Sequence, residues 1–298
     1  MHPNQDHGAD GDHAPGDGEP HRLPPGTRGR ARLLSWLKPP RPRSPTAVTA
    51  PAERRAIVIE LVIVFAITLG LAGMRALLSL LDSLLRPEPL AEQDVALHRP
   101  QAAIGVIDMA QQLLGVLQLL GWAALGLYLL WRAGIALRRI GLDASRVRRD
   151  VLTGIGLTAL IGIPGLALYF AAWSAGANLA VIPSALDDTW WQPITLTLSA
   201  FGNAAAEEIL VVGYLLTRLR QLGFGENSAL LISAILRGSY HLYQGIGGFV
   251  GNVIMGLLFG RYWQRTNRIL PLVIAHTLLD VVAFVGYAML RDHIGWLP

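Results

Sequence analysis

Long apolar runs fill the chain after its first fifty residues, and short charged stretches separate them. A run of about 18 or more apolar residues is long enough to cross a bilayer as a helix. The pattern therefore predicts an all-α fold, a polytopic bundle of about seven transmembrane helices. The predicted spans are Ala56–Met74, Met109–Trp131, Val151–Trp173, Pro193–Thr217, Ser228–Tyr243, Gly245–Tyr262 and Ile269–Leu290. We expect residues 75–85 to continue the first helix as an amphipathic extension.

The first 51 residues have a different composition, rich in Pro, Gly, His, Asp and Arg. Such a segment buries too little apolar surface to offset its chain entropy, so we predict a disordered tail over residues 1–51. Residues 52–298 then form the transmembrane domain. Its chemically interesting core lies at about residues 193–290.

Arginines are concentrated in alternate loops, which predicts the orientation of the bundle because cytoplasmic loops carry an excess of basic residues. These arginines are Arg41, Arg43, Arg54, Arg55, Arg132, Arg138, Arg139, Arg146, Arg148, Arg149, Arg218, Arg220, Arg261, Arg265 and Arg268. By contrast, residues 175–192 contain Asp187 and Asp188 but no Arg or Lys. We therefore expect a cytoplasmic N-terminus and an outer C-terminus. The net charge of +4 comes largely from these loops, so it does not indicate nucleic-acid binding.

Composition agrees with a membrane protein, since 52% of residues are hydrophobic and only 15% are charged, against roughly 25% in soluble domains. The chain has no cysteine, which excludes disulfides and thiolate chemistry. Lys38 is its only lysine. Such a preference for arginine is typical of a GC-rich bacterial genome, so the expected location is a bacterial plasma membrane.

Polar side chains occur in three of the late predicted spans, where a single charged residue costs roughly 2.5–3.5 kcal/mol to insert. Each of these spans carries a pair four residues apart, a spacing that places both side chains on one helical face. The pairs are Asn203 with Glu207, Arg237 with His241, and His276 with Asp280, and Glu208 adds a further carboxylate. The estimated depths of these residues overlap near the middle of the bilayer, so we expect them to share one cavity.

The set suits hydrolysis of an amide, which needs an activated water, a stabilised oxyanion and a proton for the leaving amine. A carboxylate beside a histidine can orient and deprotonate water, a role that fits Glu207 with His241. A second histidine held by a carboxylate can donate to the oxyanion, and His276 with Asp280 fits this role.

A zinc-dependent route is the competing chemistry, because carboxylate and imidazole groups such as Glu208, His241 and His276 are acceptable zinc ligands. The chain contains no His-Glu-x-x-His motif, and residue spacing does not choose between the two routes. A serine nucleophile is less favoured. Ser239 lies near His241, but no Gly-x-Ser-x-Gly elbow surrounds it.

These residues resemble the three motifs of the CPBP family, the intramembrane proteases of CAAX-prenyl-protein and bacteriocin processing, also called the ABI family. Glu207-Glu208 matches the first motif, His241 the second, and His276-x-x-x-Asp280 the third. The resemblance implies a peptidase whose substrate is a membrane-associated peptide or protein. It also implies that the first glutamate and His241 activate water, while His276 and Asp280 support the oxyanion. Both metal-dependent and metal-free mechanisms have been proposed for such proteins.

Two positions depart from the family pattern. The first motif continues to an arginine, but this chain has Val212 there, and the phenylalanine of the second motif is replaced by Arg237. Loss of the motif arginine removes a partner for Glu208. We expect Arg237 to supply the missing positive charge from a different helix.

Two other functions compete with the peptidase. A catalytically silent scaffold or a bacteriocin-immunity-type protein is suggested by Val212. A proton-coupled transporter could use the same carboxylates and histidines as a relay, although the hydropathy shows no inverted repeat.

Overall fold

The computed structural model describes residues 47–185 and 189–290, and these belong to a single compact unit. Residues 1–46 of the predicted tail, the acidic pair Asp187 and Asp188, and the C-terminal end lie outside the described residues. Residues at the end of the predicted tail are structured, since the Val48 amide donates to the Gln221 carbonyl (2.8 Å) and the first described helix begins at Pro51.

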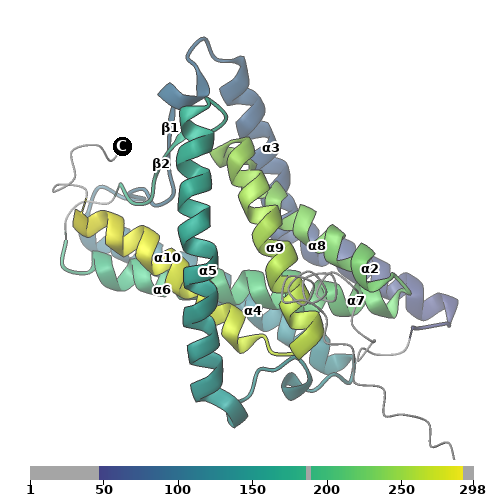
Figure 1. The fold of residues 1–298 in the computed structure, drawn as a ribbon. Coiled ribbons are helices and arrows are strands. Elements are labelled where there is room, and N and C mark those ends of the chain that lie inside the picture. Colours follow the sequence, from purple (N-terminus) through teal and green to yellow (C-terminus); the bar gives the residue numbers. More distant parts are fainter. Residues whose placement is uncertain (1–46, 186–188, 291–298) are drawn as a thin grey trace, which may run out of the picture. The chain divides into compact units, whose positions relative to one another are not determined.

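Helices dominate the described part of the chain, as the hydropathy pattern predicts (Figure 1). They are α2 (Pro51–Ile67), α3 (Leu69–Leu85), α4 (Gly105–Arg132), α5 (Val147–Ser174), α6 (Gln192–Glu207), α7 (Leu215–Gln221), α8 (Glu226–Ser239), α9 (Ile246–Thr266) and α10 (Leu270–Leu290), with a π-helical segment, η4 (Glu208–Tyr214), joining α6 to α7. Two short strands that the sequence did not predict, β1 (Asp94–Ala96) and β2 (Ala180–Ile182), pair in parallel. Short 3-10 turns complete the loops.

Within residues 47–185 and 189–290, three helices are long and apolar enough to cross a membrane: α4, α5 with its preceding turn, and α10. The pair α2 and α3 makes a fourth if it counts as one span. The other predicted spans correspond to α6–η4–α7, to α8 and to α9, which carry polar residues along their length. The 14-residue α8 rises only about 21 Å at 1.5 Å per residue, less than the hydrocarbon thickness of about 30 Å. The predicted number of seven spans is thus not confirmed.

The first predicted span bends earlier than expected. Its axis turns by 49° at Thr68, between α2 and α3, rather than continuing straight to Met74. The Thr68 hydroxyl donates to the Val64 carbonyl (2.7 Å), a side-chain bond to the preceding turn that is typical of bent helices.

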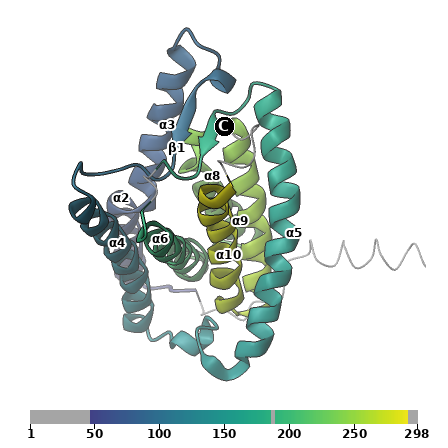
Figure 2. The same cartoon turned by 90° about the vertical axis from the view of Figure 1, so that its left-hand side faces the viewer.

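The helices that carry the polar pairs pack directly on one another. Figure 2 shows α6 between α4 and α10, with α5 outside α10. On the other side, α8 packs along α9, where Gly256 and Gly260 face Ala234 and Leu230 of α8. A methyl group on Gly256 would lie 2.9 Å from the Ala234 Cα. This glycine therefore permits the close approach that small residues give in membrane bundles.

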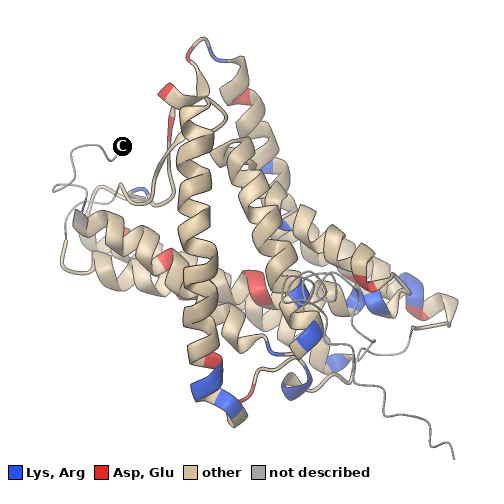
Figure 3. Ribbon diagram, viewed as in Figure 1, with Lys and Arg blue, Asp and Glu red and all other residues tan. Residues whose placement is uncertain are grey.

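The loops meet at two ends of the unit. At the arginine-rich end (residues 133–146, 222–225 and 267–269), the Ile140 carbonyl accepts from the Ile269 amide (3.0 Å) and from the Trp263 indole (3.2 Å). At the strand end (residues 86–104, 175–185 and 241–245), β1 pairs with β2, and Asn178 bridges to Gly245. Figure 3 shows basic residues near the lower ends of α5 and α9 and on α7, within or beside the first group of loops.

Candidate active site

The two adjacent glutamates lie where a regular helix changes its winding. Asn203 and Glu207 belong to α6, and Glu208 begins the π-helical segment η4. Extra residues in a helix redirect the side chains around them, and such π-segments occur frequently at functional sites. Both carboxylates are buried, with Glu207 3% and Glu208 0% exposed. The junction of α6 and η4 therefore places two carboxylates in the core, where buried charges need partners from neighbouring helices.

The histidine of the second motif is not helical, contrary to the predicted span Ser228–Tyr243. Helix α8 ends at Ser239, and the His241 amide donates to the Gly238 carbonyl (3.0 Å) in a tight turn. The expected helical face shared by Arg237 and His241 is therefore wrong. Gly245, with φ +109°, completes the reversal, and a Cβ there would lie 2.6 Å from the Ala177 carbonyl oxygen.

The third pair lies on α10 as predicted. His276 Nε2 lies 3.7 Å from an Asp280 oxygen, one turn away. Asn203 Nδ2 donates to the other Asp280 oxygen (3.0 Å), which joins α10 to α6. The carboxylate of Asp280 thus contacts the imidazole and is itself held by a neighbouring helix.

Glu208 binds two groups from other helices. Arg237, fully buried on α8, donates to Glu208 Oε1, and His276 Nδ1 lies 2.9 Å from the same oxygen. Arg237 thus reaches Glu208 from a different helix. Val212, at the motif arginine position, is fully buried in the apolar core.

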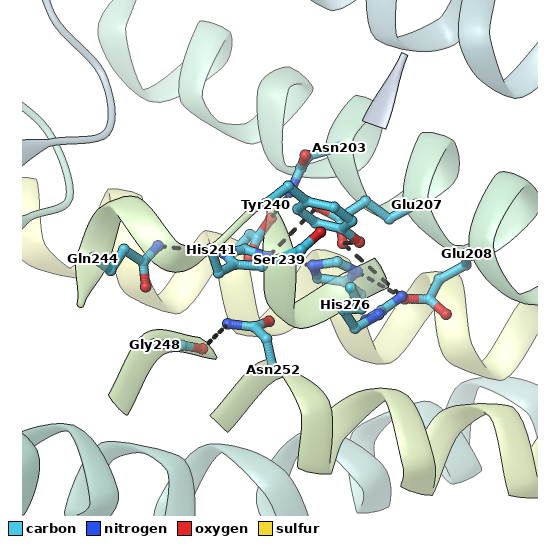
Figure 4. A network of polar contacts seen from close by, with 12 residues as sticks. Asn203, Glu207, Glu208, Ser239, Tyr240, His241, Gln244, Gly248, Asn252 and His276 are labelled. Atoms are coloured by element: carbon cyan, nitrogen blue, oxygen red, sulfur yellow. Dashed lines mark hydrogen bonds and ion pairs between the residues drawn. The ribbon is translucent and has the colours of Figure 1, made fainter. Parts of the chain in front are cut away.

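Glu207 has a different set of neighbours (Figure 4). Tyr240 donates its hydroxyl to Glu207 Oε2 (2.7 Å), and an Arg237 nitrogen lies 3.9 Å from that oxygen. His241 Nε2 faces the other oxygen, Oε1, at 3.9 Å. Sequence reasoning missed Tyr240, although its position next to His241 was a usable signal.

Several buried polar atoms of the site have no hydrogen-bond partner within the part of the chain that the structure describes. They include His241 Nε2, Glu208 Oε2 and Arg237 Nη1. Buried polar atoms in native proteins are normally hydrogen-bonded, to protein or to water. The site therefore has hydrogen-bonding capacity that its own side chains leave unused.

The candidate zinc ligands do not form a ligand set. His276 contacts Glu208, whereas His241 faces Glu207. Over residues 47–185 and 189–290, no three His, Asp or Glu side chains are grouped so that they could hold a metal ion.

The arrangement supplies the parts that acyl hydrolysis needs. Glu207 Oε1 and His241 Nε2 face each other at 3.9 Å, and His276 lies between Glu208 and Asp280. His241 and Asp280 are the more exposed members, at 15% and 17% of their side chains, while Arg237 and Glu208 are at 0%. The site is thus sealed at Glu208 and more open at His241.

Comparison with known proteins agrees with the motifs. Residues 189–282, about a third of the chain, match the family model described as type II CAAX prenyl endopeptidase Rce1-like. This match confirms the resemblance to the CPBP family. No curated protein and no solved structure matches the chain.

Proposed function

Because residues 189–282 carry the CPBP-family match, we propose that this membrane protein is an intramembrane endopeptidase that hydrolyses a peptide bond of a membrane-associated substrate. The observation that carries the proposal is the convergence of Glu207, Glu208, His241, His276 and Asp280 in one buried network. These residues come from three separate segments of the chain. A packing role alone does not require two histidines and three carboxylates in one place.

Water activation falls to Glu207 and His241. The 3.9 Å between Glu207 Oε1 and His241 Nε2 is too long for a direct hydrogen bond but short enough for one water to contact both atoms. Glu207 takes a proton from this water as the oxygen attacks the scissile carbonyl carbon. The same carboxyl group then returns the proton to the leaving amine, so the base is regenerated.

Oxyanion stabilisation falls to His276. Its Nδ1 is held against Glu208 at 2.9 Å, which fixes the direction of the ring. Its Nε2 lies 3.7 Å from Asp280, beyond hydrogen-bond distance, so the Nε2–H can donate to the oxyanion. A preorganised donor aimed at developing charge is often the largest single contribution to catalysis. Asp280 and Asn203 act as supporting residues that keep the ring in place.

Arg237 takes the role left open by Val212. It contacts Glu208 directly and lies 3.9 Å from Glu207, so it reduces the negative charge of the pair. Without it, two adjacent carboxylates would repel each other in a buried site. The loss of the motif arginine is therefore compatible with an active enzyme.

The test is cleavage of a membrane-anchored peptide library by purified protein in liposomes. We expect the wild-type protein to cleave and Glu207→Gln and His241→Ala to lose at least about 100-fold in rate, the usual contribution of a general base. The matched control is Glu53→Gln, which changes an exposed glutamate at the start of α2 and should cleave normally. We also expect the wild-type rate to survive a metal chelator.

Absence of cleavage by the wild-type protein against the whole library would contradict the proposal and favour the silent scaffold. Solute uptake driven by protons, without cleavage, would favour the transporter.

A further inference from the structure

We propose that Tyr240 is a positioning residue that holds one oxygen of Glu207 and so reserves the other oxygen for the attacking water, an inference that rests on the proposed peptidase function. Its hydroxyl donates to Glu207 Oε2 at 2.7 Å, and its side chain is buried, with 5% exposed. This is the one hydrogen bond to the Glu207 side chain among the described residues.

The two oxygens of Glu207 have different surroundings. Oε2 accepts from Tyr240 and lies 3.9 Å from Arg237, whereas Oε1 faces His241 Nε2 at 3.9 Å. The terminal torsion of a glutamate is broad and roughly two-fold, so the carboxylate alone does not keep its oxygens distinct. The tyrosine bond fixes that torsion. Only Oε1 then lies where it can take a proton from water.

The strength of this bond is adequate for the role. Hydrogen bonds from a hydroxyl to a carboxylate are charge-assisted and about twice as strong as neutral ones. The carboxylate is nearly fully buried, so solvent competes little for it. Losing the bond would let the torsion relax and would leave the base in its productive orientation for only part of the time.

A second tyrosine offers a matched control. Tyr243 lies three residues after Tyr240, and its ring stacks on His241 with centroids 6.3 Å apart. Its hydroxyl accepts from Gln244 Nε2 (3.0 Å) and makes no described contact with Glu207. The ring of Tyr240 lies closer to His241, with 4.9 Å between centroids. Both tyrosines thus lie beside the imidazole, but of the two only the Tyr240 hydroxyl bonds to Glu207.

The experiment compares Tyr240→Phe with Tyr243→Phe in the liposome cleavage assay. We expect Tyr240→Phe to lower kcat about 10- to 100-fold, the range for a hydrogen bond to a charged group, while KM changes less than about twofold. Tyr243→Phe should keep kcat within about twofold of the wild-type value. If Tyr240 had a purely structural role, Tyr240→Phe would lower the protein yield and the thermal stability, and kcat would not fall separately from KM.

A second pair of variants keeps the inference testable if Tyr240→Phe is not recovered in folded form. Tyr240→Gln keeps a donor, whereas Tyr240→Leu, of similar size, has none, so Tyr240→Gln should be the more active. Equal kcat for these two, or a wild-type kcat in Tyr240→Phe, would overturn the role of Tyr240 while wild-type cleavage persists. Failure of the peptidase assignment is distinguishable, because the wild-type protein itself would then cleave no peptide of the library.

Discussion

Arg237 and Glu208 form a fully buried ion pair. Burying either charge without its partner would cost several kcal/mol of desolvation free energy. Removing one partner of such a pair leaves an uncompensated charge, which typically costs about 3–5 kcal/mol. Arg237 Nη1 and Glu208 Oε2 also lack described partners, so the pair is not saturated by other groups. The pair therefore makes folding depend strongly on each of its two charges.

We predict that Arg237→Leu lowers the free energy of unfolding by about 3–5 kcal/mol, because the Glu208 charge loses its cation. Adding Glu208→Gln, which removes that charge, should recover part of the loss. Arg86→Leu is the control, since Arg86 pairs with Asp82 on the surface and such pairs contribute at most about 1 kcal/mol. Chemical denaturation in mild detergent measures the free energy of unfolding of the two single variants and of the double variant. Equal losses for Arg237→Leu and Arg86→Leu would contradict the prediction.

Much of this site was predictable from residue spacing. The pairs Asn203 with Glu207 and His276 with Asp280 could be placed because four-residue spacing defines a helical face. Tyr240 was missed because its one signal, a place next to His241, does not indicate a contact with Glu207, which is distant in sequence. The contact of Glu208 with His276 was hidden as well, because the π-helical winding at Glu208 has no sequence signature. Its contact with Arg237 was expected from the loss of the motif arginine.

At the scale of elements, the site depends on how closely α8 approaches α9. Gly256 lies against the backbone of Ala234, three residues before Arg237, and a Cβ on it would also approach the Arg237 Cδ to 3.3 Å. The Ala234 backbone cannot move aside to relieve a steric clash as easily as a flexible side chain can. A larger residue at position 256 must therefore push α8 and Arg237 away from the glutamates.

We predict that Gly256→Ala destabilises the protein by about 1–3 kcal/mol, the usual cost of overpacking, and lowers peptidase activity. Gly251→Ala on the same helix is the control, because its Cβ would meet only the Leu168 side chain, at an ordinary 3.6 Å. Thermal unfolding and cleavage rates of the two variants give the comparison. Similar behaviour of both glycine variants would show that α8 does not need this close approach.

A second element-scale feature fixes the start of α10 at the arginine-rich end. Arg268 donates to Asp143 (2.7 Å) and to Asp150, just before the helix that carries His276. The bond from Arg268, helped by Ser145, holds the pKa of Asp143 well below its ordinary value. A lowered pKa means that the folded state favours the ionised carboxylate. The resulting stabilisation is present above the ordinary pKa of about 3.9 and is lost as the pH falls below it.

We predict that the melting temperature falls between pH 5 and about pH 3, and that Asp143→Asn reduces this fall because it removes the titrating group. Ser145→Ala should have a smaller effect, since the Arg268 bond remains. Melting curves at several pH values measure the difference. An unchanged pH dependence in Asp143→Asn would show that this carboxylate does not contribute.

The helices were easier to predict than their ends. Apolar runs locate α4, α5 and α10 well, because composition alone separates them from the loops. The bend at Thr68 and the end of α8 before His241 depend on local hydrogen bonds and on packing between α8 and α9. The pairing of β1 with β2 joins segments more than eighty residues apart, which no local pattern reports.

At the scale of the whole described unit, successive loops alternate between the arginine-rich end and the strand end. The loop before α5 contacts the loop before α10 at one end, and the loop before α6 contacts the loop before α9 at the other. This alternation agrees with the expected topology, in which the arginine-rich end faces the cytoplasm. The side of the membrane remains a prediction.

We predict that an impermeant maleimide applied to intact cells labels Glu88→Cys but not Arg148→Cys or Phe224→Cys. The natural chain contains no cysteine, so each variant reports one position without background. Position 88 is exposed at the strand end, and positions 148 and 224 are exposed near the arginine-rich end. Labelling of all three after permeabilisation is the control, and the reverse pattern in intact cells would invert the predicted orientation.

His241 lies beyond the end of α8, in a loop that is held by backbone hydrogen bonds to residues 177–179. Leu179 donates to the Gln244 carbonyl (3.1 Å), and Ile246 donates to the Ala177 carbonyl (3.0 Å). The glutamates, by contrast, stand on a helix that continues through η4 into α7. A peptide that shifts residues 177–179 would therefore move the imidazole while the carboxylates stay fixed. Substrate recognition and assembly of the reactive centre would then depend on the same stretch of backbone.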